Sequence, residues 1–344
     1  MQQLSQFPRV SLAHRPTPLE RLPNLSRELA RAHLFVKRDD CTGLAMGGNK
    51  VRQLEFYFGE ALAADATVVL ITGAVQSNFV RCTAAAAAKT GLRCVIQLED
   101  RVKGMGFEYH ESGNVLLDHV LGAELHTYPE GEDEAGADRS LDDLANSLRD
   151  EGQRPYVVHL AGNHPPLGAL AYVEAAEEIL TQMSAHDVDL GSVIVASGSA
   201  QTHAGLLVGF HAQERADVAV HGVCVRRDAS AQAERVLKCA RATEKLLGCG
   251  RRVRDQDVLV TDKYLGPGYG RLTPETQDAI RTAARLEGLL LDPVYTGKAF
   301  AHFLGSIREN ALGDQSAAIF LHTGGTPALF AYRGLVDDAQ IARG

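Results

Sequence analysis

The sequence predicts an α/β fold in which twisted, mostly parallel sheets are flanked by helices. Short apolar runs alternate with helical patterns along most of the 344 residues, which is typical of consecutive βαβ units. The apolar runs are also uninterrupted, as expected for parallel strands that are covered on both faces. A chain of this length forms either two domains or one large one.

Each element of this fold is predicted from its local pattern. Strands are expected at the short apolar runs 68–72, 94–98, 124–128, 156–160, 192–196, 220–225, 258–261, 289–292 and 317–322. Helices are expected in the gaps between them, at 79–89, 112–121, 167–183, 273–287 and 298–309. The acidic, glycine-containing segment 130–138 is expected to be an exposed loop.

The composition argues against several classes of protein. A net charge of −8 disfavours a nucleic-acid binder, which needs a basic surface. The first residues lack the basic-then-apolar pattern of a secretory signal, and no apolar run is long enough to span a membrane. The six cysteines are scattered without a C-x-x-C pair, so we expect a reduced, cytoplasmic protein without a metal site.

The first candidate functional segment contains Lys50. Two glycines, Gly47 and Gly48, directly precede Asn49 and Lys50, and a helical pattern follows at Val51, Leu54, Phe58 and Leu62. Glycines allow the backbone to approach a ligand closely, and a lysine at the start of a helix has a fixed position. A surface lysine after a turn is the alternative interpretation.

Two further segments each join a strand to a helix. Segment 72–78 ends in Gln76, Ser77 and Asn78, and segment 196–202 combines a glycine with small hydroxyl residues. Ligands bind at the carboxyl ends of parallel strands, and helix N-termini attract anions. The first segment therefore suits a substrate carboxylate, with helix capping as the alternative role, and the second suits a phosphate.

Two later segments, 292–298 and 321–327, add the hydroxyl residues Tyr295 and Thr323 at the same edge of the sheet. A core tyrosine and a helix cap are the alternative roles. A lysine amine, a phosphate loop, a carboxylate loop and hydroxyl groups together form the set that a pyridoxal-phosphate (PLP) site needs. The P-loop and G-x-G-x-x-G spacings are missing, which disfavours a nucleotide-binding protein.

These motifs resemble the D-cysteine desulfhydrase / 1-aminocyclopropane-1-carboxylate (ACC) deaminase family of PLP enzymes, with the L-cysteate sulfo-lyases as a close branch. The resemblance runs in order from Arg15-Pro-Thr-Pro-Leu-Glu20 to 322–329. It implies a two-domain tryptophan-synthase-β-like fold (fold type II) and a homodimer. Residues 1–52 and 162–344 would form the large PLP-binding domain, and residues 53–161 a small inserted α/β domain.

The resemblance also implies roles for individual residues. Lys50 would form the Schiff base with PLP and remove the α-proton of a small amino-acid substrate, with Ser77 and Tyr295 as further catalytic residues. Cofactor contacts are implied for Lys50, Asn78, Ser197, Gly198, Ser199, Ala200, Gln201, Thr202 and Thr323. Substrate contacts are implied for Gln76, Ser77, Asn78, Phe79, His164, Tyr264, Tyr269 and Tyr295.

Two positions favour one reaction within the family. In the pattern typical of ACC deaminases, the motif Tyr-Glu-Gly-Lys stands where this chain has Tyr295 followed by Thr296. These enzymes also tend to carry Leu in place of Thr323. A neutral hydroxyl stabilises the protonated pyridine ring of PLP less than a carboxylate does. The resemblance therefore implies β-elimination and not opening of the cyclopropane ring. We therefore expect a carbon–sulfur lyase that converts D-cysteine to pyruvate, ammonia and hydrogen sulfide.

The alternatives are an L-cysteate sulfo-lyase that releases sulfite, a lyase for another β-substituted amino acid, and a non-catalytic PLP or amino-acid binding module. Departures from the family pattern leave the substrate open. Phe79 stands where histidine is usual, Cys82 where glutamine is common, and Gln201 where the phosphate loop has a glycine. Gly162-Asn-His-Pro-Pro166 replaces a Gly-Gly-Ser-Asn stretch, so Phe79 and His164 are candidates for selecting a different substrate.

Overall fold

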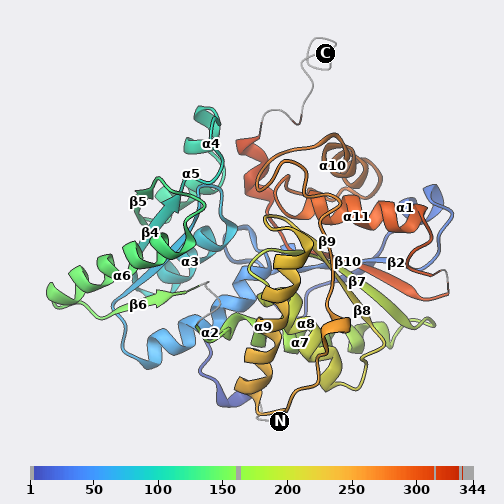
Figure 1. The fold of residues 1–344 in the computed structure, drawn as a ribbon, viewed down its shortest axis with the longest axis horizontal. Helices are drawn as coiled ribbons and strands as arrows, with labels where there is room; N and C mark the ends of the chain where they lie inside the picture. Colours follow the sequence, from blue (N-terminus) through green and yellow to red (C-terminus); the bar gives the residue numbers. More distant parts are fainter. Residues whose placement is uncertain (1–3, 160–163, 314, 333–334, 336–344) are drawn as a thin grey trace.

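The computed structural model describes residues 4–159, 164–313, 315–332 and 335, which form two sheets flanked by helices (Figure 1). The six-stranded sheet has the order β1-β2-β10-β7-β8-β9 and the four-stranded sheet the order β5-β4-β3-β6. Only the β1–β2 pair is antiparallel among these pairs. The predicted α/β fold with mostly parallel sheets is therefore confirmed.

The six-stranded sheet contains β1 (Leu19–Arg21), β2 (Leu34–Arg38), β7 (Leu190–Ser197), β8 (Ala219–Cys224), β9 (Leu259–Thr261) and β10 (Ala317–His322). One face is covered by α1 (Pro23–Glu28), α10 (Pro274–Glu287) and α11 (Thr296–Arg308). The other is covered by α7 (Leu167–Met183), α8 (Gln201–Ala212) and α9 (Ala229–Leu247). The strands are apolar on both faces because each face packs against helices.

The four-stranded sheet contains β3 (Val68–Ala74), β4 (Arg93–Glu99), β5 (Glu124–Tyr128) and β6 (Pro155–Val158). Its helices are α3 (Asn78–Thr90), α4 (Phe107–Glu111), α5 (Asn114–Val120) and α6 (Glu134–Asp150). Helix α2 (Asn49–Ala63) packs on α7 and α3 and crosses the predicted domain boundary between residues 52 and 53. The division into two domains stays a prediction.

Short 3-10 helices complete the described elements: η1 (Leu4–Gln6), η2 (Asp39–Cys41), η3 (Leu44–Met46), η4 (Asp255–Asp257) and η5 (Thr326–Ala331). Within the described part of the chain, every helix is too short or too polar to cross a lipid bilayer.

Two predicted elements are wrong. The segment 289–292 forms no strand, because its last residue, Asp292, turns the chain into α11 by accepting the backbone N–H groups of Val294, Tyr295 and Thr296. The acidic segment 130–138 is not a loop throughout, since α6 begins at Glu134. Asp133 accepts the N–H of Gly136 at 2.8 Å, and this cap allows an acidic segment to start a helix.

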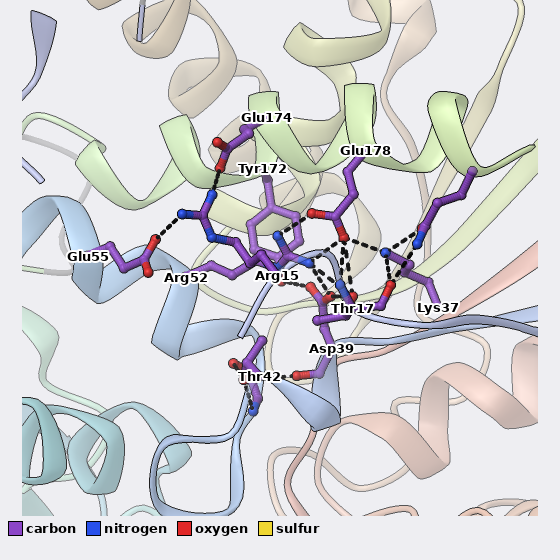
Figure 2. Close-up of polar contacts among 12 residues, drawn as sticks. Arg15, Thr17, Lys37, Asp39, Thr42, Arg52, Glu55, Tyr172, Glu174 and Glu178 are labelled. Carbon is purple, nitrogen blue, oxygen red and sulfur yellow. Dashed lines mark hydrogen bonds and ion pairs between the residues drawn. The ribbon is translucent and has the colours of Figure 1, made fainter. Parts of the chain in front are cut away.

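A buried ion-pair network holds α2 against α7 and the six-stranded sheet (Figure 2). The Arg52 side chain is fully buried and donates to Asp39 at 3.0 Å and to both carboxylate oxygens of Glu178 at 2.8 and 2.9 Å. Tyr172 donates to the second Asp39 oxygen at 2.5 Å, and Lys37 donates to Glu178 at 2.5 Å. The network fixes the helix whose second residue is Lys50.

Candidate active site

A pocket opens where the carboxyl ends of β3, β7, β8 and β10 approach the first turn of α2. Strand order therefore brings together residues that are far apart in the sequence, as expected for the ligand edge of an α/β sheet. Most of the predicted site residues line this pocket: Lys50, Ser77, Asn78, Phe79, Ser197, Gly198, Ser199, Ala200, Thr202, Tyr269, Tyr295 and Thr323.

Lys50 enters the pocket from the first turn of α2. The preceding Gly47 and Gly48 have φ angles of 66° and 115°, a conformation that side chains other than glycine rarely adopt. The Lys50 Nζ atom donates to Gln53 Oε1 at 3.2 Å and lies 4.8 Å from the centroid of the Phe79 ring. Burial lowers the pKa of Lys50 to about 8, because the charged amine loses its hydration.

The loop between β7 and α8 has the geometry of an anion site. Ala200 adopts a left-handed conformation with φ 77° and turns the chain into the helix, whose first N–H groups lack partners within the helix. Thr202 Oγ1 accepts the side-chain amides of Asn49 and Gln53, each at 2.9 Å. These two contacts leave the Thr202 hydroxyl hydrogen to donate elsewhere.

Gln201 belongs to the same loop, but its side chain points away from the pocket. Its amide exchanges hydrogen bonds with the Tyr57 hydroxyl at 2.8 and 3.1 Å. A Cβ atom added to Gly168 would lie only 2.2 Å from the Gln201 side-chain oxygen. The Gln201 side chain is therefore packed between α2 and α7. The Gln201 side chain therefore leaves the loop's pocket surface open.

Ser77 and Asn78 begin α3 and face the pocket. Ser77 accepts the N–H of Val80 as the helix N-cap, and Asn78 Oδ1 accepts from the Asn114 amide at 3.1 Å. Gln76 behaves differently, because its amide nitrogen donates to two backbone carbonyls at 2.7 and 2.9 Å and its oxygen accepts the Asn114 N–H. Its side chain thus holds the chain around α4 and α5 and does not reach the pocket.

Two tyrosines line the same pocket. The hydroxyls of Tyr269 and Tyr295 are 2.5 Å apart, and burial raises the pKa of both phenols, so both stay protonated near neutral pH. Thr323 lies nearby in the lining, and its carbonyl accepts the Asn49 N–H at 3.0 Å. Thr296 is fully buried and donates to Asp292 at 2.6 Å.

Two other predicted substrate residues lie outside this pocket. The Tyr264 ring packs against His302 with centroids 6.0 Å apart. The His164 ring stacks on His159 at 3.7 Å and lines a neighbouring hollow that shares Ser199, Arg227 and Arg235 with the main pocket. Residues 162 and 163 of the predicted 162–166 loop lie outside the described residues.

Five charged residues of the pocket lining were not predicted from the sequence: Arg101, Glu134, Arg226, Arg227 and Arg235. Arg226 and Arg227 follow β8 almost directly, so the rule that ligands bind at carboxyl strand ends could have found them. Arg101 stands two residues after β4 and donates to both oxygens of Glu99. Glu134 was not predicted as a site residue, because its segment was interpreted as an exposed loop.

The donor set fits PLP. The pocket contains one desolvated lysine amine for an aldehyde, a helix N-terminus with the Thr202 hydroxyl for a phosphate, and the protonated Tyr295 for polar ring or substrate atoms. Amine condensation and phosphate binding require these groups. Lys50 and residues 197–202 would hold the cofactor.

Comparisons with known proteins agree with this chemistry. The chain is 43% identical over 332 residues to the D-cysteine desulfhydrase of Klebsiella pneumoniae subsp. pneumoniae, covering 96% of this chain and 98% of the relative. It is 44% identical over 333 residues to that of Klebsiella pneumoniae strain 342, with the same coverage. An ACC deaminase homologue of solved structure matches with a TM-score of 0.85 and 37% identity, covering 97% of this chain and 98% of that one.

An O-ureido-L-serine synthase shares the fold, with a TM-score of 0.67 and 18% identity over 98% of each chain. The family described as "Pyridoxal-phosphate dependent enzyme" matches residues 10–324, which include every element that lines the pocket. The resemblance seen in the sequence and the expected cofactor are thus confirmed, and the chain belongs to the family of pyridoxal-phosphate dependent enzymes.

Proposed function

We propose that this chain is a carbon–sulfur lyase that uses PLP to eliminate the β-substituent of D-cysteine, releasing pyruvate, ammonia and hydrogen sulfide. The observation that carries the proposal is the desolvated amine of Lys50, which shares one pocket with the N-terminus of α8. The two relatives that are 43% and 44% identical, both D-cysteine desulfhydrases, support D-cysteine as the substrate.

Lys50 is suited to move the α-proton. Bound PLP supplies an electron-accepting ring that makes the α-proton of an amino acid acidic. With a pKa of about 8, a useful fraction of the Lys50 amine is neutral at physiological pH and accepts a proton. Its hydrogen bond to Gln53 and its contact with Phe79 orient the amine in the pocket.

The other pocket residues divide into two groups. Ser77 and Asn78 at the start of α3 present polar groups and a helix N-terminus, which suit a substrate carboxylate. Tyr269 and Tyr295 form a protonated hydroxyl pair, which can donate a proton to a departing thiolate. Thr323 is a neutral hydroxyl in the lining, and this supports elimination of a good leaving group over ring opening.

The second candidate is β-elimination of L-cysteate with release of sulfite. The observation that favours it is the positive charge of the lining. Among the described residues, the lining contains one carboxylate, that of Glu134, and five cationic side chains, those of Lys50, Arg101, Arg226, Arg227 and Arg235. A non-catalytic binding module is disfavoured, because a binder needs neither a base nor a proton donor.

The assembly and location are part of the same proposal. We infer a homodimer, a large domain of residues 1–52 and 162–344, and a small domain of residues 53–161. All six cysteines are free thiols, which supports a reducing, cytoplasmic location. The state of assembly is tested by light scattering on the purified protein, where a monomer mass would contradict the dimer.

The activity is tested with purified enzyme saturated with PLP, supplied separately with D-cysteine, L-cysteine, L-cysteate and ACC. We expect pyruvate, ammonia and hydrogen sulfide in equal amounts from D-cysteine, and no turnover by Lys50→Ala. Sulfite from L-cysteate without hydrogen sulfide from D-cysteine would select the second candidate. Absence of pyruvate from every substrate would reject a lyase.

A further inference from the structure

Three arginines converge on one carboxylate at the edge of the active-site pocket. Arg226 and Arg227 both donate to Glu134 Oε1, and Arg235 approaches Glu134 Oε2 at 3.5 Å. The arginines come from the end of β8 and from α9, whereas Glu134 is the first residue of α6 beside the four-stranded sheet. All four residues line the pocket that contains Lys50.

Three guanidinium groups share the carboxylate of Glu134 in this cluster. Glu132 also pairs with Arg226 at 3.1 Å, but its side chain is 73% exposed, so its contribution is weak. Burial and the neighbouring Arg235 lower the pKa of Arg227, because both disfavour its charged form. Guanidinium groups gathered in this way recognise oxyanions, because each offers several donors in one plane.

The cluster is joined to the candidate anion loop. Arg227 Nη1 donates to the Gly198 carbonyl at 3.3 Å, and Arg226 lines the same pocket as the hydrogen-bonded pair Tyr269 and Tyr295. A ligand held by the arginines would thus lie beside the pocket's proton donors. The Glu134 side chain is 36% exposed, compared with 8–20% for the three arginines. Glu134 can therefore rotate into solvent while the three guanidinium groups keep their positions.

We propose that Arg226, Arg227 and Arg235 form an anion subsite for the β-substituent of the substrate, with Glu134 as its internal occupant. Amino acids whose β-substituent is an oxyanion, such as a sulfonate, would displace Glu134 and bind the three guanidinium groups. The inference rests on the proposed β-elimination and names a substrate class for the same pocket.

The reaction of such a substrate balances without an oxidant. The Lys50 amine takes the α-proton, the Cβ–S bond breaks, and its electron pair leaves with the sulfur as sulfite. One cysteate anion and one water give one pyruvate, one ammonium and one hydrogensulfite. The arginines stabilise the negative charge on the departing group.

Binding of unreactive analogues to the PLP-loaded enzyme tests the subsite independently of turnover. The probes are 3-sulfopropanoate and 3-mercaptopropanoate, which lack the amino group and differ in the β-substituent. By titration calorimetry, we expect wild type to bind the sulfonate about tenfold more tightly, since a charge-assisted contact is worth about 1.4 kcal/mol or more. Arg226→Gln should abolish this preference, and equal affinities in wild type would overturn the proposal.

Glu134→Gln distinguishes the subsite from a purely structural contact, because the two roles predict opposite signs. Removal of the internal carboxylate should tighten sulfonate binding about tenfold and leave 3-mercaptopropanoate unchanged. Glu309→Gln, which removes an equal charge from the exposed pair with Lys263, is the control and should change neither affinity. Weaker binding of both probes by Glu134→Gln would show a structural clamp and contradict the subsite.

The cofactor phosphate is another anion, so its affinity is measured separately. PLP is titrated into the apoenzyme forms of wild type and Glu134→Gln. We expect wild type and Glu134→Gln to bind PLP with equal affinity. If Glu134→Gln tightens PLP and not the sulfonate, the cluster serves the cofactor and the proposal is wrong. If D-cysteine is turned over but no sulfonate preference is found, the proposed lyase stands without the subsite.

Discussion

The Nζ atom of Lys50 lies 4.8 Å from the centroid of the Phe79 ring. The ring therefore places an apolar face, and not a titratable group, beside the amine. The ring is almost completely buried and lies 6.2 Å from the Tyr57 ring, which keeps water away from one side of the lysine. Burial is the main cause of the lowered pKa of Lys50.

Phe79→Leu should lower the pKa of Lys50 further, by about half a unit, because leucine keeps the site dry but removes the attraction between ammonium and ring. The pKa is measured from the pH dependence of Lys50 acetylation in the apoenzyme, followed by mass spectrometry. Phe303→Leu, which alters a buried ring in another cluster, serves as control. A raised pKa in Phe79→Leu would contradict the contact.

The rate of PLP capture by the apoenzyme should rise with pH and level off above about pH 8. Only the neutral amine attacks an aldehyde, and the neutral fraction of Lys50 passes one half at its pKa of about 8. Stopped-flow absorbance gives the rate, with a small primary amine as the reference reaction. A rate that keeps rising to the pH range of an ordinary lysine, about 10.4, would show that Lys50 is not desolvated.

Thr202→Val should weaken PLP binding about tenfold. The valine keeps the shape but removes the proposed phosphate donor, and it leaves the amides of Asn49 and Gln53 without the acceptor they share. Equilibrium titration of the apoenzyme with PLP measures the effect. Thr243→Val removes a buried hydroxyl on α9 that donates to the Cys239 carbonyl, and it should leave PLP affinity unchanged. Equal losses in both variants would indicate a general effect of stability.

Arg52→Met should lower the free energy of unfolding by about 3–5 kcal/mol, because it leaves Asp39 and Glu178 as buried charges without their main cation (Figure 2). Urea unfolding of the apoenzyme measures the loss. The control is Arg93→Met, which removes an exposed pair with Glu124 and should cost about 1 kcal/mol or less. Similar losses in the two variants would contradict the role of the network.

Much of the fold could be predicted from local pattern. The strands 124–128 and 317–322 and the helix 167–183 coincide with β5, β10 and α7, because long apolar runs and clear helix ends dominate there. The strand β2 was missed because Lys37 and Arg38 interrupt its apolar run, although Lys37 is fully buried. Its burial depends on Glu178, which is 141 residues away in the chain, and no local pattern reveals such a pair.

The site residues that stand at the carboxyl ends of strands could be predicted from the sequence. Ser77, Ser197 and Thr323 each stand at or just after a strand and line the pocket. Side-chain direction was not predictable: Gln76 and Gln201 occupy the right loops, but their amides bond to distant groups instead of facing the pocket. Glu134 reaches the pocket from the other sheet, which depends on how the two sheets pack.

Borohydride reduction of the PLP-loaded enzyme, followed by peptide mapping, tests whether Lys50 holds PLP. Lys298 is the internal comparison, since burial lowers its pKa to about 8 as well but its amine donates to the carbonyls of Leu265 and Gly268. We expect one pyridoxyl group per chain, on Lys50, and none in Lys50→Ala. A label on Lys298, or a colourless wild-type protein after PLP addition, would contradict it.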